Sequence, residues 1–139
     1  MPLRLPIPPL DLEATLDGGQ AFRWRWVDGA WEGIIGTRWV RLRAEAGHLL
    51  TETGTDPGDG TWLRHYLGLE DDLETIVRTF PDDPPLRKAV DACPGLRLLR
   101  QDPWECLASF ILSSTKQIVQ IQQCVALLCD AFGEPIPGP

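Results

Sequence analysis

The stretch that decides the fold runs from Gly95 to Gly133 and reads GLRLLRQDPWECLASFILSSTKQIVQIQQCVALLCDAFG. Its apolar residues recur at helical spacing on both sides of a short polar break, Ser113–Gln117, so two helices joined at this break are predicted. The first helix has a strong start signal. Asp102 suits the cap, Pro103 suits the first helical position, and Glu105 can reach back to the cap.

The two predicted helices differ in character. The first runs to about Ser113 and is apolar nearly all round, which is typical of a helix buried at the centre of a domain. The second is expected to begin at Ser114 and to end at Gly133. Its predicted buried stripe consists of Ile118, Ile121, Val125, Leu128, Cys129 and Phe132.

The N-terminal half has the two-residue alternation of strands. Asp11 is expected to cap a helical turn that carries Leu12 and Leu16 on one side. Antiparallel strands are predicted at 20–27, 31–37, 38–44 and 48–53, with Phe22, Trp24 and Trp26 on a buried face and Asp28-Gly29 as a hairpin turn. Short helices are predicted at 61–67, 70–80 and 86–93. The fold class is therefore α+β, with an N-terminal α+β domain over residues 1–93 and the start of a helical domain over residues 94–139.

Bulk properties limit the possible functions. The chain has 139 residues, 43% hydrophobic and 24% charged, and a net charge of −7. The acidity lies in the middle: residues 1–50 sum to 0, residues 51–92 to −6 and residues 93–139 to −1. We expect no membrane span and no secretory signal, and hence a cytoplasmic or nucleoid-associated protein. The spacing of Cys93, Cys106, Cys124 and Cys129 indicates reduced, buried thiols, and we expect no metal and no cofactor.

The polar break is the candidate site for an anion. A helix N-terminus presents free backbone N–H groups and the positive end of its dipole, and the break adds hydroxyls, an amide and an ammonium group. It could therefore hold a phosphate of a nucleic acid, but composition alone favours plain helix capping. Five arginines interleaved with tryptophans on the predicted strands are similarly ambiguous, and a solvated outer sheet face is the simpler interpretation.

Two sequence blocks resemble a known family. The block Leu12–Arg25 contains Gly19-Gln20-Ala-Phe22-Arg-Trp, and the block Gly95–Ser114 contains RLLRQDPWE followed by SFILSS. Both closely resemble the 8-oxoguanine DNA glycosylase and AP lyase family of the helix-hairpin-helix superfamily, and they occur in the family's order. The resemblance covers roughly Leu10 to Gly133, the N-terminal portion of that family only.

The resemblance implies DNA base excision repair, with recognition and removal of 8-oxoguanine from damaged double-stranded DNA. It assigns substrate binding to Gly19, whose backbone carbonyl would sense the lesion, together with Gln20 and Phe22. It assigns the DNA wedge to Ser114, Thr115, Lys116 and Gln117, with Gln120 where some members have an arginine that contacts the orphaned cytosine. The family usually has an asparagine triplet where this chain has Thr115-Lys116-Gln117.

The family's catalytic lysine and aspartate follow a helix-hairpin-helix turn, C-terminal to the matching region. This chain contains only two lysines, Lys88 and Lys116, and neither has that context. No catalytic residue is therefore assigned. We expect these 139 residues to lack the C-terminal helical region of the full-length enzyme and to be inactive alone. The all-apolar helix should then be partly exposed, which predicts marginal stability or self-association.

Three alternatives stay open at this point. The fold could serve a glycosylase for alkylated purines. The chain could be a non-catalytic remnant that still binds DNA. It could also be a partner-binding domain without a DNA role, which the net charge of −7 favours.

Overall fold

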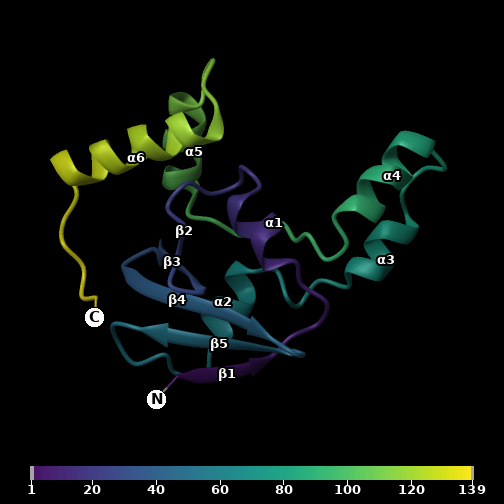
Figure 1. Cartoon of the computed structure of the whole chain (residues 1–139), viewed down its shortest axis with the longest axis horizontal. Helices are drawn as coiled ribbons and strands as arrows, with labels where there is room; N and C mark the ends of the chain where they lie inside the picture. The colour runs from purple at the N-terminus through teal and green to yellow at the C-terminus, as the bar shows by residue number, and fades with distance from the viewer. Residues whose placement is uncertain (1, 139) are drawn as a thin grey trace.

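A five-stranded antiparallel sheet forms the body of the molecule, and the α+β fold class is confirmed (Figure 1). The computed structural model describes residues 2–138. The spatial order of the strands is β1-β5-β4-β3-β2. Their bounds are β1 Leu3–Pro6, β2 Arg25–Val27, β3 Ala30–Ile35, β4 Arg38–Glu45 and β5 His48–Thr53.

The sheet follows the alternation in the sequence. Val40 and Leu42 of β4 are fully buried, and Arg41 between them is only half-buried and forms an ion pair with Glu32. Asp28 and Gly29 both take positive φ, 46° and 80°, as the predicted tight hairpin between β2 and β3 requires. The strand that sequence analysis missed is β1, which pairs antiparallel with β5 with Leu5 opposite Leu49.

Two short helices cover the buried face of the sheet. These are α1, Leu12–Asp17, capped by Asp11 as predicted, and α2, Thr61–Tyr66. Leu16 and Leu63 are fully buried against the sheet residues. At the centre, Trp24 Nε1 donates a hydrogen bond of 3.1 Å to the Tyr66 hydroxyl, so the buried indole N–H has a partner.

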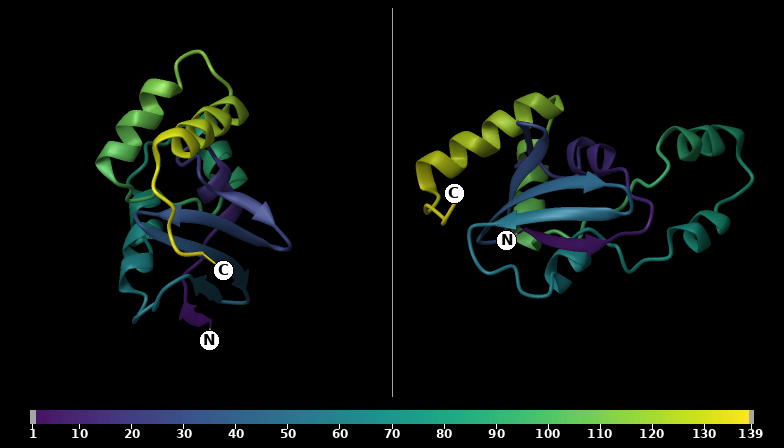
Figure 2. Two further views of the ribbon diagram at one scale, coloured as in Figure 1. Left: turned by 90° about the vertical axis from the view of Figure 1, so that its left-hand side faces the viewer. Right: turned by 60° about the horizontal axis from the view of Figure 1, so that its bottom comes forward.

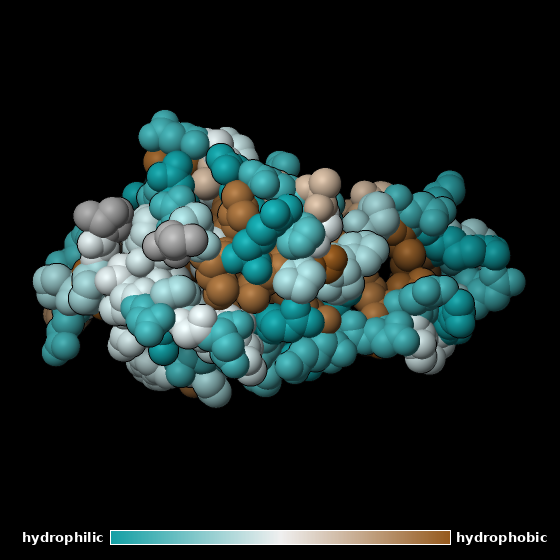
Figure 3. Space-filling model, turned by 90° about the horizontal axis from the view of Figure 1, so that it is seen from below, coloured by the Kyte–Doolittle hydropathy of each residue, from teal (hydrophilic) through white to brown (hydrophobic). Residues whose placement is uncertain are grey.

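The helices α3, Leu73–Arg78, and α4, Pro84–Ala92, project from one end of the molecule (Figures 1 and 2). No residue of these two helices belongs to the main core. Instead Val77 and Phe80 of this region face Leu86 and Val90 across a small hollow. Seen from below, apolar surface lies in the middle of the molecule and toward this end, broken by polar groups (Figure 3).

The decisive stretch forms a helical hairpin away from α3 and α4, toward the left of Figure 1, made of α5, Pro103–Leu112, and α6, Ile118–Phe132. Asp102 caps α5 as predicted, and Gly133 follows the last residue of α6. Within the described residues α5 is not central but largely exposed, which agrees with the expectation that the all-apolar helix is partly exposed here. Trp104 is 71% exposed and Phe110 is 74% exposed. The periodicity of a sequence shows which face of a helix is apolar, but it does not show which other elements pack against that face.

Three further expectations need correction. The strand predicted at 20–27 is regular only over β2, because the backbone at Gln20 is hydrogen-bonded to the side chain of Gln101 instead of to another strand. Trp26 is 61% exposed, with its ring edge against Trp31. The cysteines are free but not buried: Cys124 is half-buried, and the others are exposed.

Candidate functional site

The turn after α1 carries Gly19 next to the first turn of α6. Gly19 has φ +92°, a conformation that side chains disfavour. A Cβ atom at this position would lie 3.2 Å from Cδ1 of Ile118. The glycine that the family resemblance singles out therefore lies beside the helix that follows the polar break, although 99 residues separate the two in sequence.

A hydrogen bond also links this turn to α6. Gln122 Nε2 donates to Asp17 Oδ1 at 3.0 Å. Ile118 and Gln122 are one helical turn apart on α6, so the same face of the helix contacts both ends of the Asp17–Gly19 turn. The position of the turn is thus coupled to the position of the helical hairpin.

The polar break is exposed and has a specific backbone form. Ser113 ends α5, and its hydroxyl donates to Phe110 O at 2.7 Å. Thr115 takes a positive φ of 60°. The side chains of Ser114, Thr115, Lys116 and Gln117 all face solvent. They are therefore available to contact a ligand.

The cap of the second helix lies three residues later than predicted. Gln117, not Ser114, is the capping residue, because the left-handed conformation of Thr115 separates Ser114 from the helix. Gln120 closes this cap: its Oε1 accepts a hydrogen bond of 2.9 Å from Gln117 N. The Gln120 side chain, expected to point toward DNA, thus has its carbonyl oxygen engaged within its own helix.

Gln20 and Phe22 differ in their surroundings. The Gln20 amide forms hydrogen bonds with three backbone groups, at Thr15, Arg97 and Leu99. Phe22 is half-buried and lines a broad groove of about 970 Å³ between the sheet, α6 and the C-terminal segment. Gly19 thus lies beside Ile118 of α6, and Phe22 lines a groove that α6 also lines.

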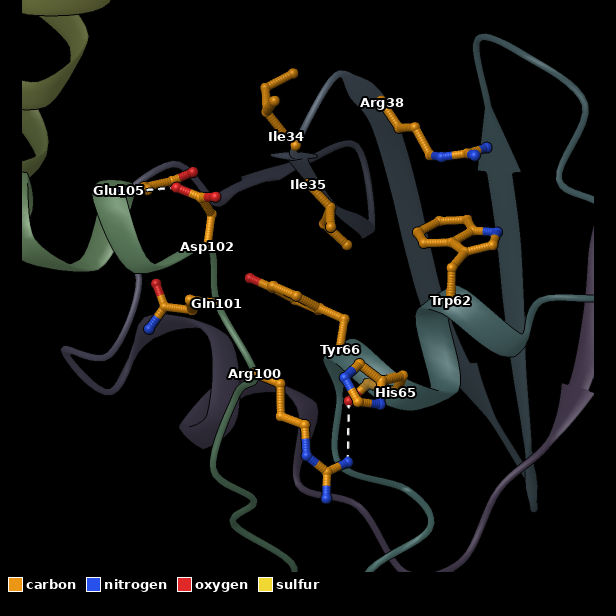
Figure 4. A pocket seen from close by; sticks show the side chains of 11 residues that line it. Ile34, Ile35, Arg38, Trp62, His65, Tyr66, Arg100, Gln101, Asp102 and Glu105 are labelled. Atoms are coloured by element: carbon orange, nitrogen blue, oxygen red, sulfur yellow. Dashed lines mark hydrogen bonds between the residues drawn. The ribbon is translucent and has the colours of Figure 1, made fainter.

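A second hollow, of about 250 Å³, lies between the end of β3, α2 and the start of α5 (Figure 4). Burial raises the pKa of Tyr66, at its wall, to about 12. Burial also raises the pKa of Glu105, against the opposing effect of Arg23, whose Nη1 lies 3.5 Å from Glu105 Oε2. Arg38 stacks over Trp62, with 5.1 Å from its Cζ to the ring centroid.

Sequence reasoning did not identify this second hollow. Its residues come from distant parts of the chain, and no local motif joins them. The hollow is lined by hydrophobic, basic and acidic side chains together, so its lining does not favour one chemical class of ligand. Elsewhere in residues 2–138, no cluster of three or more potential metal ligands occurs, and none of the helices described is long and apolar enough to cross a membrane.

The geometry therefore offers one coherent candidate site. A backbone turn held open by glycine lies against the start of α6, next to an exposed polar break that contains the hairpin's single lysine, Lys116. Such a site can offer a fixed carbonyl and several flexible polar side chains to one ligand. Within the residues described, it contains no candidate nucleophile with a paired base.

Comparison with known proteins shows what the chain is similar to. A sequence profile described as "8-oxoguanine DNA glycosylase, N-terminal domain" matches residues 2–107. The chain is 33% identical over 131 residues to the N-glycosylase/DNA lyase OGG1 of Arabidopsis thaliana, covering 89% of this chain and 36% of that protein. It is also 33% identical over 128 residues to a probable N-glycosylase/DNA lyase of Methanothermobacter thermautotrophicus, covering 85% and 41%.

Solved structures agree as well. MBOgg1 in complex with a low-affinity DNA ligand superposes with a TM-score of 0.88 at 31% identity, covering 97% of this chain and 47% of that one. The Clostridium acetobutylicum 8-oxoguanine glycosylase/lyase, in complex with DNA containing cytosine opposite 8-oxoguanine, superposes with a TM-score of 0.83 at 27% identity, covering 96% and 49%. The chain thus spans about two fifths of the curated relatives and about half of the solved ones.

Proposed function

The chain belongs to the 8-oxoguanine DNA glycosylase family, and on that premise we propose that it supplies the lesion-sensing and DNA-wedge part of an 8-oxoguanine repair enzyme. The proposed partner is double-stranded DNA containing the oxidised base. We propose two domains: an α+β domain at residues 1–93, and the first helices of a helical domain at residues 94–139.

One observation carries the proposal: Gly19 lies directly beside Ile118, at the start of the helix that follows the polar break. A sensor for a flipped base and a wedge that replaces it in the duplex must act on neighbouring positions of one strand. The contact between the Gly19 turn and α6 supports that pairing of roles. Extruding the base costs a few kcal/mol, so both elements need to contribute binding energy.

Gly19 is proposed to discriminate through its backbone carbonyl. 8-Oxoguanine differs from guanine by an N7–H donor, whereas N7 of guanine is an acceptor. A fixed carbonyl that faces N7 would accept a hydrogen bond from the oxidised base and would meet a lone pair on the normal one. A glycine permits this approach because it has no Cβ and tolerates φ +92°.

The wedge is proposed to consist of Ser114, Thr115, Lys116 and Gln117. Their exposure supports this role, although the Gln117 side chain also takes part in the capping box at the start of α6. Lys116 is the single basic residue of the helical hairpin and would contact a phosphate. Gln120 is a weaker candidate for reading the opposite base, because its carbonyl oxygen already accepts from Gln117 N.

Catalysis is not proposed for these 139 residues. The family resemblance calls for a lysine and an aspartate after a helix-hairpin-helix turn, and the two lysines here lie elsewhere. Lys88 is on α4 at the far end of the molecule, and Lys116 is in the proposed wedge (Figure 1). We expect the purified chain to bind lesion DNA without cleaving the glycosidic bond.

The test is equilibrium binding of the chain to duplexes that differ in one base, 8-oxoguanine or guanine opposite cytosine, with fluorescence anisotropy as the readout. Tighter binding to the oxidised duplex is the expected result. Equal binding to both duplexes would favour a non-catalytic protein that binds DNA without sensing the lesion. If a third duplex with an alkylated purine bound most tightly, a glycosylase for alkylated purines would be favoured. Robust excision of 8-oxoguanine by the chain would contradict the expected inactivity.

A further inference from the structure

We infer that Gln20 is a positioning residue: its side-chain amide clamps the Gly19 turn to the extended segment Arg97–Leu99 and does not itself contact the base. This inference rests on the proposed function of Gly19. It assigns Gln20 a role different from the substrate contact expected from its place in the motif.

The hydrogen bonds of Gln20 leave its amide little capacity for a ligand. Nε2 donates both to Thr15 O at 3.2 Å and to Arg97 O at 2.8 Å, which uses both of its N–H groups. Oε1 accepts from Leu99 N at 3.0 Å. These partners also fix the orientation of the amide. If the amide were flipped, its oxygen would face the carbonyl oxygens of Thr15 and Arg97, and its NH2 group would face the N–H of Leu99.

The backbone of Gln20 is held from the other side. Gln101 Nε2 donates to Gln20 O at 2.6 Å, so the peptide unit next to the Gly19 turn is fixed by a second glutamine. Arg97 N donates to the Thr15 hydroxyl at 3.2 Å, and Thr15 is fully buried. Four side chain–backbone hydrogen bonds between Gln20 or Thr15 and residues 97–101 therefore run in parallel.

The clamping segment is itself anchored to the core. Arg97 is 5% exposed, and its Nη1 donates to Gly68 O at 2.7 Å and to Asp71 O at 3.0 Å, just beyond α2. Arg100 N donates to Tyr66 O at 2.8 Å. The position of the Gly19 carbonyl is thus determined through Gln20 by α2, an element buried against the sheet.

Rigid placement is what the sensor chemistry demands. A carbonyl on a mobile turn could rotate away from the lone pair of guanine N7, and discrimination would be lost while general DNA binding remained. Gln20 prevents this rotation without occupying the ligand side. Its loss should therefore reduce selectivity for the oxidised base more than affinity for undamaged DNA.

The test compares the full chain with Gln20→Met, which keeps the length of the side chain and removes its polar atoms. The matched control is Gln123→Met, at an exposed position of α6. The quantity measured is the ratio of Kd for the guanine duplex to Kd for the 8-oxoguanine duplex. Gln20→Met is expected to lower this ratio by about three- to tenfold, the worth of one hydrogen bond, with Kd for the guanine duplex unchanged.

Two further measurements separate positioning from general damage. Asp11→Ala removes the cap of α1, where Ala14 N donates to Asp11 Oδ1, and should lower stability while keeping the ratio. Hydrogen exchange at the Leu99 amide reports the clamp directly, and it should accelerate in Gln20→Met only. An unchanged ratio in Gln20→Met, or an equal loss of affinity for both duplexes, would overturn the inference.

The two proposals can fail separately. If the unmodified chain binds both duplexes equally, the lesion-sensing function fails. Hydrogen exchange then still decides whether Gln20 is a clamp. If the unmodified chain discriminates and Leu99 exchange is the same with and without Gln20, the clamp fails and the function stands.

Discussion

Replacing Gly19 with alanine should damage both stability and lesion selectivity, and the two effects can be separated. At φ +92° an alanine meets the steric penalty of the left-handed region, about 1–2 kcal/mol. The added Cβ would lie 3.2 Å from Ile118 Cδ1, which is tight. That atom is the end of a flexible side chain, so a shift of a few tenths of an ångström relieves the contact.

The hairpin glycine between β2 and β3 provides the matched control. Gly29 has φ +80°, and an added Cβ there meets nothing within 4 Å. Gly29→Ala should therefore carry the same backbone penalty without touching the Gly19 turn. Both variants are expected to unfold at a temperature lower by roughly 3–6 °C.

Selectivity should distinguish the two variants. Gly19→Ala shifts the carbonyl proposed to face N7, so the ratio of Kd values for guanine and 8-oxoguanine duplexes should fall about tenfold, toward one. Gly29→Ala should keep the ratio. The reasoning is refuted if Gly29→Ala loses selectivity equally, or if Gly19→Ala keeps both its stability and its selectivity.

Three further predictions concern charge, pH and association. Lys116→Met should make the slope of log K against log salt shallower by about 0.9, the value for one phosphate contact, whereas Lys88→Met on α4 should leave it unchanged; equal slopes in all three proteins would contradict the wedge. The contribution of Tyr66 to the unfolding free energy should be constant below pH 10 and should fall by about 2–3 kcal/mol between pH 10 and 12. Burial raises the pKa of Tyr66 to about 12 from its ordinary value near 10, so the folded state disfavours the tyrosinate that forms readily after unfolding. Tyr66 is the only tyrosine, so ultraviolet absorbance of the tyrosinate follows its titration directly, and a midpoint near 10 in the folded protein would disprove the shift. Phe110 is 74% exposed on an apolar helix, so the chain should self-associate in sedimentation experiments at high concentration, and Phe110→Glu should return it to a monomer; a compact monomer before the substitution would count against this.

Local features of the structure could be predicted from the sequence because their causes are local. Asp11 and Asp102 cap helices through hydrogen bonds to residues three positions later. Asp28-Gly29 makes the expected tight turn, and the alternation around Val40 and Leu42 gives the expected buried face. In each case the deciding interaction spans a few residues or one face of one strand.

Features that depend on distant partners could not be predicted in this way. The Gly19 turn is fixed by residues about 80 positions away, and no periodicity encodes that contact. The expected strand from Gln20 fails for the same reason, because side chains from the later segment take its hydrogen bonds. The late start of α6 has a local cause, the left-handed Thr115, which the capping pattern of Ser114 did not reveal.

The two glutamines of the candidate site illustrate one physical limit on motif reasoning. Gln20 and Gln120 both stand where the family resemblance suggests contact with a nucleotide, yet each uses its amide oxygen on a backbone N–H of this chain. A buried N–H that loses its partner costs about 1–3 kcal/mol, and loss of an exposed helix cap typically costs about 1 kcal/mol, so a ligand would have to repay that cost before gaining anything from either oxygen. Discrimination at this site should therefore rest on the Gly19 carbonyl for the damaged base. The DNA strand would then be contacted by Thr115, Lys116 and Gln117. These contacts would give little preference for the base opposite the lesion.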